Sequence, residues 1–108
     1  MNNDIRFEDF LYYPKLRTRA AELNGLRHLT DERKDKIIPI ITAGKWPRAT
    51  SFDSGINKVT EFFTNRPFFL DLTDEQNTFS AEQATLKNAT NNYQNWREYV
   101  RRFPSAIP

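Results

Sequence analysis

The chain has 108 residues, of which 38% are hydrophobic, 28% charged and 14% aromatic, and its 16 basic and 14 acidic side chains give a net charge of +2. This length predicts one domain or part of one. The near balance of charge argues against a dedicated nucleic-acid-binding protein, whose usual footprint is a strong basic excess on one face. A local basic patch leaves nucleic acid open as a partner. Because the chain has no cysteine, disulfides, thiolate metal sites and cysteine nucleophiles are excluded.

The first ten residues do not have the pattern of a signal peptide. Residues 1–10 are predominantly polar and are predicted to form an N-terminal arm, followed by a partial β/α-barrel-like domain over residues 11–108. The start lacks the apolar core of a signal peptide. No apolar run approaches the roughly 20 residues that cross a bilayer. We therefore expect a cytoplasmic protein with no membrane partner.

Two short apolar segments in the first half of the chain are predicted to be strands, and each leads into an amphipathic helix. The first strand is expected at 12–17 and its helix at 18–29, with Thr18 as the N-cap. The second strand, at 37–42, is a nearly continuous apolar run, which is typical of a strand in a parallel sheet. The helix after it is expected to begin near residue 51 or 53.

The second half of the chain repeats this order with one additional helix. A third strand is predicted at 68–72, and a helix at 80–88, where Ser80 and Gln83 match a capping box. A last helix is expected to begin at Asn91 or Asn92, since its apolar residues recur at helical spacing up to Phe103. A fourth strand begins at 106–108.

Strands that alternate with helices predict an α/β fold with a parallel sheet. The chain holds three βα units plus an extra helix, about half of a TIM-barrel-like parallel β/α domain, since a complete barrel needs about 250 residues. Right-handed crossovers would place the helices on one face of a closing sheet or on both faces of an open one. Both arrangements are open at this point. The stop at Pro108, just after a strand-like segment, predicts that the chain is a fragment of a longer protein.

Parallel sheets bind ligands at the carboxyl ends of their strands, and four residues are candidates there. Lys15 and Arg17 share one face of the first strand and are candidate ligands for a phosphate group. Asp71, in the third strand, is the candidate catalytic acid or base. Trp46, between cations in the loop after the second strand, is a candidate to stack on a base or sugar. The competing interpretation is structural: Arg17 and Asp71 form an internal ion pair, and Trp46 covers the end of the sheet.

No motif predicts a metal ion or another cofactor. The acidic run Asp71–Glu75 offers oxygen ligands but lacks the spacing of a defined metal-binding loop. Three scattered glycines cannot form a glycine-rich phosphate loop. We therefore expect neither a metal site nor a cofactor.

Four blocks in a fixed order give the chain a family resemblance. They are Tyr12–Leu23, Asp35–Ile41, Arg66–Leu72 and Asn92–Val100. Together they resemble the N-terminal part of the bacterial and phage-encoded beta protein family, over roughly Tyr12 to Pro108. The resemblance implies a longer, β/α-barrel-like parent found in bacterial and prophage genomes. It brings no established reaction and therefore no catalytic residues.

Two functions follow as hypotheses. The first is a poorly characterised phage- or prophage-type beta protein that binds a phosphate-containing or nucleotide-like ligand at the carboxyl ends of the strands. The alternative is a non-catalytic protein-interaction module, compatible with a role in phage–host conflict. There, exposed aromatic residues such as Trp46 and Phe79 mark a partner surface. Self-association is a further expectation, because half a barrel leaves an open sheet edge. Whether the chain is an enzyme is left undecided by the sequence.

Overall fold

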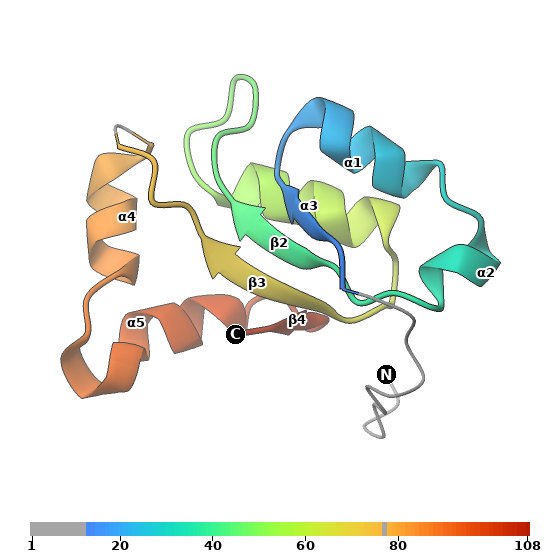
Figure 1. The fold of residues 1–108 in the computed structure, drawn as a ribbon. Helices are drawn as coiled ribbons and strands as arrows, with labels where there is room; N and C mark the ends of the chain where they lie inside the picture. Colours follow the sequence, from blue (N-terminus) through green and yellow to red (C-terminus); the bar gives the residue numbers. More distant parts are fainter. Residues whose placement is uncertain (1–12, 77) are drawn as a thin grey trace.

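The computed structural model describes residues 13–76 and 78–108 and contains a four-stranded, all-parallel sheet (Figure 1). The strand order is β1-β2-β3-β4, with strands β1 (Lys15–Arg17), β2 (Ile40–Ala43), β3 (Phe68–Leu72) and β4 (Ala106–Ile107). The described helices are α1 (Ala20–Arg27), α2 (Asp31–Lys34), α3 (Asp53–Phe62), α4 (Ser80–Leu86) and α5 (Thr90–Val100). The predicted α/β fold is confirmed. The predicted N-terminal arm, residues 1–10, lies outside the described residues.

Strand register divides the sheet into two chemically different faces. Lys15, Ile40, Phe69 and Ile107 form one row across the strands, and Arg17, Thr42 and Asp71 form the next row on the same face. We call this the open face, because its residues are half-buried or exposed. The alternate strand residues face the other way and join the hydrophobic core.

The second face of the sheet, which we call the helix face, is covered by the connecting helices. Right-handed crossovers between strands in sequential order place every connection on one side, and α3 lies behind the strands in Figure 1. A single core results from this arrangement. Its members include Leu23 and Leu26 of α1, Ile56 and Val59 of α3, Ile41 of β2, Leu70 of β3, and Tyr99 and Val100 of α5.

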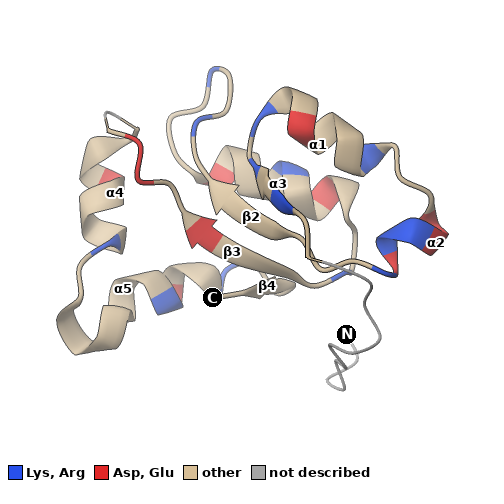
Figure 2. Ribbon diagram, viewed as in Figure 1, with Lys and Arg blue, Asp and Glu red and all other residues tan. Residues whose placement is uncertain are grey.

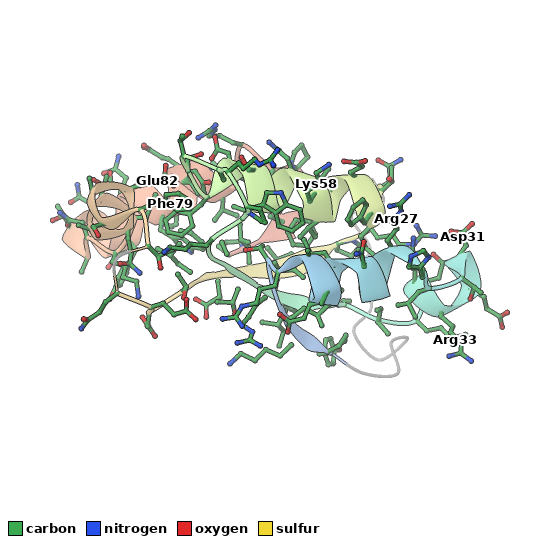
Figure 3. All side chains as sticks on the ribbon, turned by 90° about the horizontal axis from the view of Figure 1, so that it is seen from above. Arg27, Asp31, Arg33, Lys58, Phe79 and Glu82 are labelled. Carbon is green, nitrogen blue, oxygen red and sulfur yellow. The ribbon has the colours of Figure 1, made fainter. Side chains whose placement is uncertain are left out.

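Helices α1 and α3 are joined at the surface through an aromatic ring. The guanidinium of Arg27 and the ammonium of Lys58 lie 5.5 and 5.9 Å from the centroid of the Phe62 ring. Figure 3 shows Arg27 and Lys58 on these two neighbouring helices. Cation–π contacts at the surface contribute roughly 0.5–1 kcal/mol each, and Phe62 is half-buried against the core. Among the described residues, no helix combines the length and apolar character needed to cross a membrane.

The predicted strands were placed correctly, but two of them start later than expected. Strand β1 begins at Lys15, and β2 covers Ile40–Ala43 instead of 37–42. Proline explains the later starts, because Pro14 and Pro39 have no N–H to donate to a ladder. Each contributes its carbonyl instead, accepting from Ile40 and Phe69 respectively. Strand β3 matches the predicted 68–72.

The predicted caps were wrong in each of the three helices. Thr18 does not cap α1, whose N-cap is Arg19. Ser80 and Gln83 do not form a capping box, since Phe79 precedes α4 in a left-handed conformation with φ 45°. Asn91 and Asn92 lie inside α5, where they and Tyr93 also have positive φ. The side chains of Thr18 and Gln83 form hydrogen bonds with other segments instead. At the start of α5, Asn91 and Asn92 have positive φ, which differs from the extended backbone of an N-cap residue.

Candidate functional site

A hollow of about 250 Å³ opens at the carboxyl ends of β1 and β2. Its lining combines three cations, three threonines, one glycine and one carboxylate, namely Arg17, Arg19, Lys45, Thr18, Thr42, Thr73, Gly44 and Glu75. We call it the cationic hollow. It lies at the strand ends where parallel sheets bind their ligands.

Thr18 fixes the floor of the cationic hollow. Its side chain is 1% exposed, and its backbone N–H donates to the carbonyl of Thr42 at 3.2 Å. Its Oγ1 accepts from the N–H of Gly44 at 2.8 Å. These two bonds join the end of β1 to the end of β2. They also explain why Thr18 is unavailable as the cap of α1.

Gly55 and Gln83 fix the elements on either side of Thr18 and Thr73. A Cβ on Gly55 of α3 would lie 2.8 Å from the Cβ of Thr18, so the close approach of α3 requires glycine. On the opposite side, Nε2 of Gln83 donates to the carbonyls of Thr73 and Glu75 at 2.7 and 3.2 Å. The segment that carries Glu75 is thereby attached to α4.

The cations of the hollow are only partly neutralised. Arg17 donates to Glu22 at 3.2 Å, and Arg19 donates to Glu75 at 3.1 Å. Lys45 forms no ion pair with any described residue. Figure 2 shows basic residues in β1 and in the loop after β2, and acidic residues at the end of β3 and in the segment after it. The side chains at the ends of β1 and β2 therefore carry an excess of positive charge.

A second hollow of about 480 Å³ adjoins the first and shares two of its cations, Arg19 and Lys45. We call it the tryptophan hollow, because Trp46 and Phe79 line it. Phe79 packs edge to face against Phe52, with ring centroids 5.0 Å apart. The N–H of Phe52 in turn donates to Glu82 at 2.8 Å, and Figure 3 shows Phe79 and Glu82 together at α4.

The structure separates the four residues that sequence analysis predicted as a site. Arg17 lines the cationic hollow, and Trp46 lines the tryptophan hollow. Lys15 is on the same face as Arg17 but one row further from the strand ends. Asp71 lies in the row of Arg17, two strands away, which is about 10 Å at ordinary strand spacing.

The predicted ion pair between Arg17 and Asp71 was wrong. Arg17 pairs with Glu22, and the Oδ1 atom of Asp71 accepts from the N–H of Leu72 at 2.9 Å. Asp71 forms no ion pair with any residue in the described part of the chain. The idea that Trp46 and Phe79 are exposed was also wrong, because both are half-buried against the core.

Two contributors to the cationic hollow were absent from the predicted site. Arg19 and Lys45 each lie two residues after the end of a strand, Arg19 in the basic segment that begins with Lys15 and Lys45 beside Trp46. Their position just after strands is the signal that indicates them. The threonine hydroxyls leave no such signal, because threonine is equally common as an ordinary strand residue. No group of three or more His, Asp or Glu side chains that could hold a metal ion occurs in residues 13–76 and 78–108.

Comparison with known proteins gives the chain its family. The model of the family described as Beta protein matches residues 12–108. Over 104 residues, 96% of this chain, it is 40% identical to Protein beta of Enterobacteria phage P4. The chain spans the N-terminal 29% of that relative's length. No solved structure matches. The extent of both sequence matches shows that this chain belongs to the Beta protein family.

Proposed function

We propose that this phage-type beta protein binds a phosphate-containing, nucleotide-like ligand at the carboxyl ends of its strands. The observation that carries the proposal is the set of three cations, Arg17, Arg19 and Lys45, around one hollow that contains a single carboxylate. Arginine and lysine are the side chains that bind phosphate oxygens, by bidentate hydrogen bonds and by charge respectively. Threonine hydroxyls in the same lining add neutral donors.

The tryptophan hollow supports a nucleotide-like ligand over phosphate alone. It shares Arg19 and Lys45 with the cationic hollow, so a phosphate held by these cations leaves the attached group beside Trp46. Stacking of a base on an aromatic side chain contributes roughly 1–3 kcal/mol. The two hollows thus supply a phosphate contact and an aromatic contact to one ligand.

Glu75 forms an ion pair with Arg19, and a phosphate ligand would compete with it for this cation. Both side chains of this pair are more than half exposed, and exposed ion pairs contribute at most about 1 kcal/mol. A phosphate group carries more charge than a carboxylate, so it can displace Glu75 from Arg19 with only a small loss of interaction energy. Removal of Glu75 should therefore tighten binding.

Asp71 is the proposed acid or base, and Lys15 a secondary cation. Asp71 shares its sheet row with Arg17 and has no described cationic partner, so its carboxylate is free to contact a ligand that extends along the row. Lys15 would contact only a ligand that reaches the next row of the open face. Whether a reaction follows binding is decided by a turnover measurement on Asp71→Asn.

Calorimetric titration with AMP, adenosine and inorganic phosphate tests the proposal. AMP is expected to bind at least about tenfold more tightly than adenosine, since charge-assisted hydrogen bonds contribute about 1.5–3 kcal/mol. Arg19→Ala should weaken AMP binding and Glu75→Gln should strengthen it. Lys36→Ala is the matched control, because Lys36 is an exposed cation before β2, at the opposite end of the sheet. Equal binding of AMP and adenosine, or equal losses in Arg19→Ala and Lys36→Ala, would contradict the proposal.

The alternative, a protein-interaction module, is favoured by the open face and by the free edges of the sheet. Strands β1 and β4 each have one described neighbour, and Ile40 and Ile107 on the open face are half-buried. We propose that further parallel strands continue the sheet into a barrel-like domain, since the strand order is that of half a barrel. For this chain alone, the expected partner is a second copy. Sedimentation equilibrium tests it: a monomer at every concentration, with Ile107→Lys unchanged in mass, would overturn self-association.

A further inference from the structure

A third hollow, of about 350 Å³, lies between the end of β3 and helices α4 and α5. Two aromatic side chains, Tyr93 and Trp96, line it together with Leu72 and Leu86. Its charged lining consists of Asp71, Asp74 and Lys87. It shares no lining residue with the cationic hollow or the tryptophan hollow.

The charge of this hollow is opposite to that of the cationic hollow. Lys87 forms an ion pair with Asp74, and this pair lowers the pKa of Asp74. Asp71 is left without a cationic partner among the described residues, and its Oδ1 accepts only from the N–H of Leu72. One uncompensated carboxylate therefore stands beside two aromatic rings.

The backbone that presents Tyr93 is strained. Tyr93 has φ 59° and ψ 43°, in a left-handed turn with Asn91 and Asn92. Asparagine tolerates this region, whereas a residue such as tyrosine there costs roughly 1–2 kcal/mol. Strained residues persist where the surrounding structure holds them, and they concentrate at functional sites.

Arg97 holds this turn in place from within α5. Its guanidinium donates to the carbonyls of Asn91 and Asn92 at 2.8 and 3.0 Å. Asn91 also donates to the side chain of Gln94 at 3.0 Å. Tyr93 nevertheless stays 52% exposed in this arrangement. Burial in the core therefore does not explain the strained position of Tyr93 at the edge of the hollow.

We propose that this hollow binds an organic cation, of the class of methylated or quaternary ammonium groups. Ammonium groups with methyl substituents are recognised by aromatic faces and a nearby carboxylate, because their charge is spread over an apolar surface. Tyr93 and Trp96 supply aromatic lining, with Trp96 stacked on Tyr99 at a centroid distance of 6.1 Å, and Asp71 supplies the carboxylate. The apolar contacts of Leu72 and Leu86 match the methyl groups. Asp71 serves here as a binding residue, whether or not it also transfers a proton.

The proposal is tested with choline and with 3,3-dimethyl-1-butanol, which has the same shape but no charge. The chain has two tryptophans, so two indole N–H signals in a ¹H–¹⁵N NMR spectrum report on the two aromatic hollows. Choline should shift the Trp96 signal and leave the Trp46 signal in place. The neutral isostere should bind about tenfold more weakly. Trp46→Phe assigns the two signals.

Three variants sharpen the result. Asp71→Asn and Tyr93→Leu should each weaken choline binding about fivefold or more. Lys87→Met should strengthen it, because it removes the competing cation and frees Asp74. Melting temperatures of the variants show whether the fold is kept. If Tyr93→Leu unfolds, Asp71→Asn alone decides, since Asp71 is exposed.

Three outcomes would overturn the proposal: an unmoved Trp96 signal, equal affinity for the two isosteres, or undiminished choline binding by Asp71→Asn. A shift of Trp96 by adenosine but not by choline would assign the hollow to a base instead. Failure of AMP to bind would contradict phosphate binding in the cationic hollow and leave choline binding untouched, because Asp71 lines this hollow and not the cationic one, and the two share no lining residue.

Discussion

The two faces of the sheet are built from alternate residues of the same strands, yet they differ in nearly every property. On the helix face, Ile41 and Leu70 are at most 3% exposed and belong to one continuous core. On the open face, Arg17 and Asp71 are exposed and charged. The helix face stabilises the fold, and the open face with its strand ends carries the candidate chemistry. This division teaches that substitutions on adjacent residues should have very different consequences.

Neighbouring isoleucines of β2 give the largest expected contrast. Ile41→Ala should destabilise the protein by about 2–5 kcal/mol, because it leaves a cavity in a closed core. Ile40→Ala should cost only about 1 kcal/mol, since Ile40 is half-buried on the open face and leaves no closed cavity. Urea denaturation of both variants measures the difference. Equal losses would show that the open face is packed as firmly as the helix face.

Two helical glycines test how tightly the helix face is packed. Gly55→Ala should destabilise by roughly 1–3 kcal/mol, because its Cβ would lie 2.8 Å from that of Thr18. Gly25→Ala should stabilise by about 0.5–1 kcal/mol, since nothing lies within 4 Å and alanine favours the helix. Thermal melting distinguishes the two. If Gly55→Ala were more stable than the wild type, Thr18 at the end of β1 could shift to make room for the methyl group. That result would contradict a rigid floor of the cationic hollow.

The hydroxyl of Tyr99 tests a polar contact on the helix side. It donates to Asp53 at 2.5 Å, and burial followed by the Asp53 carboxylate raises the pKa of Tyr99. Tyr99→Phe should cost about 1 kcal/mol at neutral pH. A raised folded-state pKa stabilises the protein fully below the unfolded value of about 10, and this stabilisation is lost as pH rises further. The difference between wild type and variant should therefore shrink in alkaline urea titrations, while the exposed Tyr93→Phe control should change little at any pH.

The smallest effect is expected for Asp74, in the exposed segment after β3. Its pKa is lowered by its hydrogen bond and charge interaction with Lys87. A lowered folded-state pKa stabilises the protein above the unfolded value, near 3.8, and the gain is lost as pH falls through the folded value. Asp74→Asn should thus lower the melting temperature slightly at pH about 7 and not at pH about 2. High salt should remove the difference, as expected for an exposed pair; a large, salt-independent loss would contradict the comparison.

Sequence patterns predicted the elements well and their ends poorly. The apolar runs located β2 and β3, because burial of a strand requires consecutive apolar residues whatever the surroundings. Whether a polar side chain caps a helix depends on which hydrogen-bond partners the rest of the fold brings to it. Thr18 matches an N-cap pattern, but the N–H of Gly44 from another strand uses its hydroxyl. Such a contact lies 26 residues away in the chain and leaves no local signal.

Local sequence rules predicted the strand positions of the candidate residues but not the side chains that they contact. Alternation, a local rule, placed Lys15 and Arg17 on one face of the first strand. The strand register of the structure then showed that Asp71 lies in the same row as Arg17. Their partners were not predictable in this way. Arg17 meets Glu22 and Asp71 turns to its own backbone, since strand spacing holds the two about 10 Å apart.

The sequence by itself determined the α/β class, the order of strands and helices, and the family, because these depend on periodicity and on ordered blocks along the chain. Only the tertiary structure decided that α1, α3, α4 and α5 contribute to one core on the helix face, and that hollows lined by described residues lie at the strand ends. The tertiary structure also brought Arg19 and Glu75 together across 56 positions. The physical reason is that periodicity is a property of neighbouring residues, whereas a hollow and its charge arise from side chains that only the packed sheet brings together.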